Sequence, residues 1–126
     1  MAAEHRRSER VAEGIREEVA TFLAEDVRDP RVVGLVTVTG VDVTRDLRHA
    51  KVYVSIMGSD EERQATLQGL ESAAGHLRSR VGRALRLRVA PEITFKYDES
   101  IARAAKIEAL LAELRPPPPG DEEQRG

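Results

Sequence analysis

Cysteine and tryptophan are absent from the 126-residue sequence, which holds only two phenylalanines and two tyrosines. Without cysteine the chain can form no disulfide, no zinc–thiolate site and no thiol nucleophile. So few aromatic rings argue against single-strand binding by an array of stacking side chains. The core must therefore be built mainly from valine, leucine, isoleucine and alanine.

Long apolar runs and a strong net charge are missing as well. No run is long enough to span a bilayer, and residues 1–10 contain no hydrophobic signal segment, so we expect a cytoplasmic protein without a membrane partner. A composition of 40% apolar and 33% charged residues fits one small folded domain. The net charge of −2 means that any basic surface is local and is balanced elsewhere.

The periodicity of the apolar residues predicts an α+β domain. Spacings of three and four residues indicate helices, and alternation or β-branched runs indicate strands. The expected order is a helix at 6–25, strands at 32–44 and 50–57, a helix from 60 that is interrupted at Gly75 and resumes to about 85, a strand at 91–97 and a helix at 101–114. The first two strands should form an antiparallel hairpin, with bends or bulges at Gly34 and Gly40.

Local signals mark the ends of these segments. Ser59 and Glu62 have the spacing of a capping box, and one glycine in a helix costs about 1 kcal/mol relative to alanine, so we expect a kink at Gly75 that divides two helices. We expect residues 1–5 to be flexible, 6–98 to form the domain, 99–115 to form a C-terminal helix, and the tail, with four consecutive prolines and then acidic residues, to be disordered at 116–126.

The most informative feature is a run of five arginines, from Arg78 to Arg88, that no acidic residue interrupts. On a helical wheel the arginines up to Arg86 share one arc with two glycines and a serine, whereas Arg88 falls on the apolar side, so the helix should end before it. Guanidinium groups bind phosphate through bidentate hydrogen bonds. The arc is therefore a candidate surface for a nucleic-acid backbone, although a solvated basic face is the plain alternative.

A smaller basic cluster lies near the N-terminus, and it matters only if the first helix starts beside the arginine helix. With it, the candidate RNA-binding residues are His76, Arg78, Ser79, Arg80, Arg83, Arg86, Arg88, Arg6, Arg7 and Arg10. No convergent catalytic set and no phosphate-loop or dinucleotide motif is visible. We therefore predict neither enzymatic activity nor a metal or cofactor.

Several separate motifs carry a resemblance to a known family. The element order resembles the type II KH domain, an RNA-binding fold, but the Gly-x-x-Gly loop of KH domains is replaced by Ala73-Ala74-Gly75. Such an Ala-x-Gly kink is typical of the bacterial ribosome-binding factor A family. The stretches at 28–31, 41–55 and 91–100 also resemble that family, and the resemblance covers roughly residues 5–114.

The resemblance implies a three-stranded sheet packed by helices, plus a C-terminal helix. It also implies a cytoplasmic, non-catalytic factor that binds the immature small (30S) ribosomal subunit through 16S rRNA and assists late maturation of that RNA. Ala73, Ala74 and Gly75 would form the kink, and the arginines after them would face the rRNA. A role in cold adaptation and a functional link to ribosome-associated GTPases follow from the same resemblance, and we expect a monomer.

Two other functions stay open from the residues alone. Two helices joined by a short break can imitate the helix-turn-helix of a DNA-binding protein. Alternatively, the chain could be a protein-interaction adaptor, in which a strand edge or the last helix docks a partner and the arginines face an acidic surface.

Overall fold

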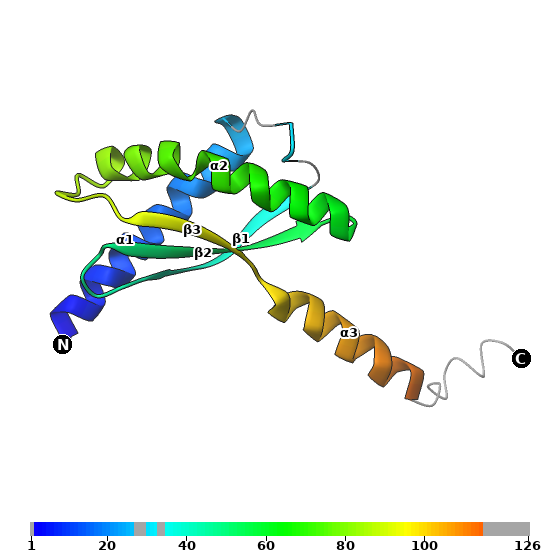
Figure 1. Cartoon of the computed structure of the whole chain (residues 1–126). Helices are drawn as coiled ribbons and strands as arrows, with labels where there is room; N and C mark the ends of the chain where they lie inside the picture. Colours follow the sequence, from blue (N-terminus) through cyan, green and yellow to red (C-terminus); the bar gives the residue numbers. More distant parts are fainter. Residues whose placement is uncertain (1, 27–29, 33–34, 115–126) are drawn as a thin grey trace, which may run out of the picture.

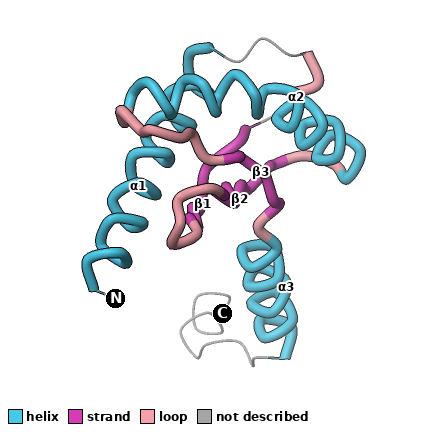
Figure 2. The backbone as a smooth tube through the Cα atoms, turned by 60° about the vertical axis from the view of Figure 1, so that its left-hand side comes forward, coloured by secondary structure: helices cyan, strands magenta, loops and turns pink. Residues whose placement is uncertain are grey.

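The computed structural model describes residues 2–26, 30–32 and 35–114. It is an α+β fold in which two helices cover one face of a three-stranded sheet and a third helix extends away from this body (Figures 1 and 2). The fold class is as predicted. The expected tail, together with residue 115 and parts of the connection before the first strand, lies outside the described residues.

The first helix, α1 (Ala2–Thr21), begins four residues before the expected start, so residues 2–5 are helical rather than a flexible lead. A π-helical turn, η1 (Phe22–Asp26), continues it. The predicted apolar stripe is confirmed, because Val11, Ile15, Val19 and Phe22 are all buried. These side chains fix which face of α1 meets the sheet and which face carries its arginines.

The sheet has the order β1 (Leu35–Val43), β2 (His49–Met57), β3 (Glu92–Tyr97). The first two strands form the predicted antiparallel hairpin, whose register shifts between Val38 and Gly40, where a bulge was expected. The third strand runs parallel to β2, so its start lies beside the start of β2. Alternation is as predicted in β3, where Ile93 and Phe95 are buried and Thr94 and Lys96 are exposed.

One continuous helix, α2 (Asp60–Ala84), connects β2 to β3. The predicted division into two helices at Ala73, Ala74 and Gly75 is therefore wrong. Leu70, Leu77 and Val81 are fully buried on one stripe that stays in phase across Gly75. Their burial outweighs the cost of about 1 kcal/mol for a single helical glycine.

The last helix, α3 (Glu99–Leu114), follows Asp98, whose carboxylate accepts a hydrogen bond from the backbone N–H of Ser100 at 2.9 Å. Asp98 thus caps the helix. Large apolar side chains on α3 are half exposed or more, among them Leu110, Leu111 and Leu114. Within the described chain no helix is both long and apolar enough to cross a membrane.

The capping box at the start of α2 gives a direct test of local stability. The Glu62 N–H donates to the Ser59 hydroxyl at 3.1 Å, and the Ser59 N–H donates to the Glu62 carboxylate at 2.9 Å. We expect Ser59→Ala to lower the free energy of unfolding by about 1 kcal/mol, because it leaves a helix-end N–H without its acceptor. Urea denaturation measures this difference.

Ser79→Ala, an exposed serine within the same helix, is the matched control and should change the free energy of unfolding by less than about 0.5 kcal/mol. Equal losses in the two variants would show that the capping box does not stabilise this helix.

Candidate nucleic-acid interface

The arginine run occupies the second half of α2 and the connection that follows it. Leu77 and Val81 point into the core, so the opposite side of the helix faces outward. His76, Arg78, Ser79 and Arg83 are exposed, as the helical wheel predicts. The structure thus places a basic outer face on α2.

Two members of this face also make contacts within the fold. The Arg78 Nε–H donates to the carbonyl oxygen of Ala90 at 3.1 Å, which ties the helix to the connection before β3. The His76 ring lies 5.6 Å from the ring of Phe22, centre to centre, in a tilted arrangement. Both side chains are nevertheless exposed to solvent, so they can still reach a ligand.

Arg80 differs from its neighbours. Its Nε–H donates to the Glu18 carboxylate of α1 at 2.9 Å, and the side chains of Arg80 and Glu18 are only 22% and 27% exposed. A charge-neutralised, mostly covered guanidinium is a poor phosphate ligand. Arg80 therefore joins α1 to α2, and its contact with RNA stays a prediction.

The glycines of the arc behave differently from each other. A Cβ added at Gly75 would meet nothing within 4 Å, so the helix surface is open there, as expected. A Cβ at Gly82 would lie 3.0 Å from the Ala90 side chain. The wheel placed Gly82 on the ligand-facing arc, but it faces the chain segment that leads into β3.

The end of α2 differs from the helical-wheel prediction, which placed Arg86 within the helix. Leu85 caps the helix and Arg86 adopts a left-handed conformation with φ 53°. The N–H of Leu87 donates to the Gly82 carbonyl oxygen at 3.0 Å, and the N–H of Arg86 donates to the Arg83 carbonyl oxygen at 3.3 Å. This is a Schellman motif with arginine in the position that usually holds glycine. Arg86 is exposed, but it lies beyond the helix and not on its outer face. Arg88 also lies outside the helix, as predicted.

The start of α1 lies beside this helix end, which was the condition for its arginines to matter. A hollow of about 300 Å³, here called the helix-end hollow, is lined by Arg7, Arg10, Val11, Leu85, Arg86 and Leu87. Gly14 allows the close approach, since a Cβ there would lie 2.5 Å from Leu85. Arg6 is exposed on the same helix but does not line this hollow.

A second hollow of about 310 Å³ adjoins it and shares Arg7 and Leu87. We call it the hairpin notch; it is lined by Arg7, Arg45, Asp46, Leu47, Arg48, Leu87, Arg88 and Val89. Arg45 and Arg48 lie in the turn between β1 and β2, which sequence reasoning treated only as a polar connection. The signal that points to them is the parallel pairing of β2 with β3, which puts the starts of both strands at one end.

Asp46 is the carboxylate in the notch. Its pKa is lowered from the ordinary value of 3.8, first by the hydrogen bond from the Thr44 hydroxyl and then by the backbone N–H of Arg48. The same oxygen, Oδ1, accepts both bonds, at 2.7 and 3.1 Å. Asp46 is thus ionised at neutral pH and holds the turn together.

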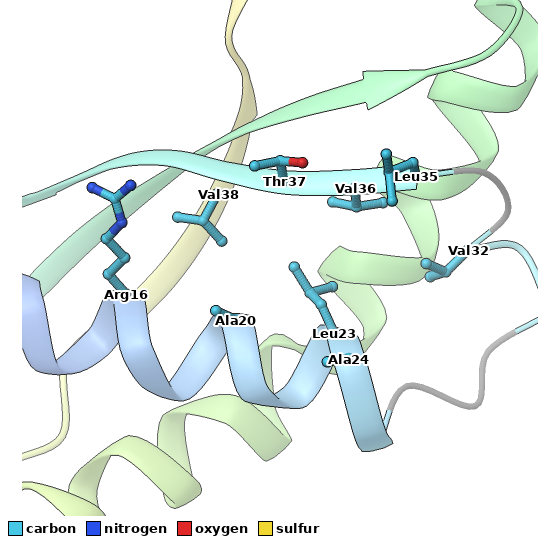
Figure 3. A pocket seen from close by; sticks show the side chains of 9 residues that line it. All are labelled: Arg16, Ala20, Leu23, Ala24, Val32, Leu35, Val36, Thr37 and Val38. Carbon is cyan, nitrogen blue, oxygen red and sulfur yellow. The ribbon is translucent and has the colours of Figure 1, made fainter.

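A third hollow, of about 510 Å³, lies between α1 and β1 (Figure 3). Aliphatic side chains such as Leu23, Val36 and Val38 form most of its walls, and Arg16 and Thr37 are its polar members. It lacks the converging cations of the other two hollows. The arginine-lined end of the molecule is therefore the better candidate for binding a polyanion.

The arrangement defines a class of protein: a KH-like α+β fold with a basic surface on the outer face of α2 and at the end of that helix. The family model of ribosome-binding factor A matches residues 7–111, and the chain belongs to this family.

Relatives and solved structures agree with this assignment. A ribosome-binding factor A of Gemmatimonas aurantiaca is 62% identical over 112 residues, which are 89% of this chain and 77% of that protein. The solution structure of a putative ribosome-binding factor A from Thermotoga maritima has 33% identity and a TM-score of 0.56, over 76% of this chain and 87% of that one. A homology model of the Thermus thermophilus ribosome-binding factor A, fitted into a cryo-electron microscopy map of its 30S complex, has 25% identity and a TM-score of 0.53, over 74% of this chain and 92% of that one.

The unusual helix end makes a testable prediction. We expect Arg86→Gly to raise the free energy of unfolding by about 0.5–1 kcal/mol, because glycine adopts the left-handed conformation without a Cβ clash. Arg88→Gly is the control and should be neutral or destabilising, since Arg88 is not among the described residues with positive φ. Urea denaturation of both variants decides; a loss of stability in Arg86→Gly would contradict the strain argument.

The contact between Arg80 and Glu18 can be tested separately. A double-mutant cycle with Arg80→Ala and Glu18→Ala should give a coupling free energy of about 1 kcal/mol, because the ion pair is mostly covered from solvent. A coupling near zero would mean that the pair does not join the helices.

Proposed function

We propose that this protein binds the small (30S) ribosomal subunit through phosphates of its 16S rRNA and assists late maturation of that RNA. The observation that carries the proposal is the meeting of Arg7, Arg10 and Arg86 at one hollow, next to the basic outer face of α2. A homologue is described in a 30S complex, and the family is named for ribosome binding, which supports the same partner.

The chemistry of the surface favours binding over catalysis. Arginine stays protonated at every physiological pH, so it can hold phosphate oxygens but cannot exchange protons as an acid or base. We infer that the protein contributes binding energy to one state of the subunit and performs no reaction. A cytoplasmic location, a monomeric state, a part in cold adaptation and a link to ribosome-associated GTPases belong to the same proposal.

The interface on this proposal consists of two adjoining parts. The outer face of α2 supplies Arg78, Arg83 and the open surface at Gly75, where a sugar-phosphate backbone can approach the helix closely. The helix-end hollow supplies Arg7, Arg10 and Arg86 from two helices. Phosphate contacts from several directions fix the orientation of the protein on folded RNA.

The structure does not support the alternative of a DNA-binding helix-turn-helix. It depends on two helices joined at residues 73–75, and the structure has one helix there. The adaptor alternative has one observation in its favour, the exposed apolar side chains of α3. Partner binding that survives RNase treatment would favour it over the RNA-based proposal.

The proposal predicts a charge-dependent association. Arg83→Glu with Arg86→Glu should abolish co-sedimentation with 30S subunits, because two phosphate ligands become repulsive. With four to six phosphate contacts, the wild-type log–log slope of affinity against salt should be roughly −3 to −5.

The matched control is Arg103→Glu with Lys106→Glu on α3, which makes the same change in net charge on a helix that extends away from the hollows. This variant should keep most of its association. Unchanged co-sedimentation of the Arg83 and Arg86 variant, with its fold intact by circular dichroism, would overturn the proposed function.

A further inference from the structure

The hairpin notch brings together arginines from three segments that are far apart in the sequence. Arg7 comes from α1, Arg45 and Arg48 from the β1–β2 turn, and Arg88 from the connection between α2 and β3. All four are exposed. In Figure 1 these three segments lie at the left-hand end of the molecule, on the side of the labelled N-terminus.

The charges in the notch are unbalanced. Four guanidinium groups face one carboxylate, that of Asp46, and Oδ1 of this carboxylate already accepts two hydrogen bonds within the turn. None of the four arginines is in an ion pair with a described carboxylate. The notch therefore keeps a positive surplus that an anion can neutralise.

The backbone under these side chains is held firmly. The N–H of Leu47 donates to the Thr44 carbonyl oxygen at 2.9 Å, and the Thr44 N–H donates to the His49 carbonyl oxygen at 3.0 Å. Leu47 adopts a left-handed conformation with φ 60°, and its side chain is buried in the core. Because the backbone of the turn is already ordered, binding costs mainly the conformational entropy of the arginine side chains.

A further bond ties the turn to the third segment. The N–H of Glu92, the first residue of β3, donates to the Arg48 carbonyl oxygen at 2.8 Å. The relative position of the turn and of the connection that carries Arg88 is thus set by main-chain pairing. Main-chain hydrogen bonds thus fix the backbone positions from which Arg45 and Arg48 extend next to the start of β3.

The lining indicates which part of a nucleic acid would bind. It contains no aromatic ring on which a base could stack, and its polar groups are guanidinium donors and one carboxylate. Bidentate guanidinium donors suit the oxygens of a phosphodiester. The notch also shares Arg7 and Leu87 with the helix-end hollow, so one backbone can pass from one to the other.

We propose that the hairpin notch is a phosphate-binding site for the rRNA backbone, and that the RNA track runs from the outer face of α2 across the helix ends to the β1–β2 turn. This inference rests on the proposed function and adds Arg45 and Arg48, beside the already predicted Arg88, as ligands of one further phosphate. Asp46 is then a repulsive group at the edge of the interface, kept because it holds the turn.

The test compares variants that change the charge of the notch in opposite directions. Arg45→Gln with Arg48→Gln should weaken association with 30S subunits at least about tenfold in co-sedimentation, the loss expected for charged hydrogen bonds. The log–log slope of affinity against salt should become less negative by about one to two. Asp46→Asn keeps the acceptor for Thr44 and for the Arg48 N–H but removes the negative charge. It should tighten association, by up to about fivefold.

Arg103→Gln with Lys106→Gln is the control for the change in net charge, and thermal melting checks that each variant is folded. If the Arg83 and Arg86 variant loses association while the notch variants bind as the wild type does, the inference is wrong and the proposed function stands. If neither set changes association, the proposed function itself fails. Should the double glutamine variant unfold, Asp46→Asn decides, because unchanged or weaker binding would contradict the phosphate site.

Discussion

The stripe of Leu70, Leu77 and Val81, completely buried on α2, is the constraint on which the rest of this structure depends. It fixes the rotation of a 25-residue helix on the sheet, so the opposite side of the helix faces solvent. Arg78 and Arg83 are thereby displayed on the exposed face of α2. The same packing lets α1 cross close to α2, where Gly14 leaves room for Leu85 and Glu18 reaches Arg80.

Sequence reasoning succeeded where the signal is local. The helix stripe of α1, the alternation in β3, the capping box at Ser59 and the bulge near Gly40 each follow from residues close together in the chain. The prediction of two helices divided at Gly75 was wrong because it considered only the low helix propensity of glycine. It left out the burial of apolar side chains on both sides of Gly75. The stripe that continues in phase across the glycine was present in the sequence and pointed to one helix.

Only part of the candidate site could be predicted, because sequence patterns report local structure and not contacts between distant segments. The wheel found the exposed positions of α2, but it could not show that Arg80 meets Glu18, that Gly82 faces Ala90, or that Arg86 lies beyond the helix in a left-handed conformation. Arg45 and Arg48 were missed because their contribution depends on which strands pair. Only the parallel pairing of β2 with β3 brings the hairpin turn to the connection that carries Arg88.

Site-specific photocrosslinking tests the central claim, that rRNA lies along the arginine-lined end, most directly. A photoreactive residue at Ser79, on the outer face of α2, is compared with one at Thr94, exposed on the face of the sheet that the helices leave open. With 30S subunits the account predicts strong crosslinks to 16S rRNA from position 79 and few from position 94. Crosslinks to rRNA mainly from position 94, or only to proteins from position 79, would contradict it.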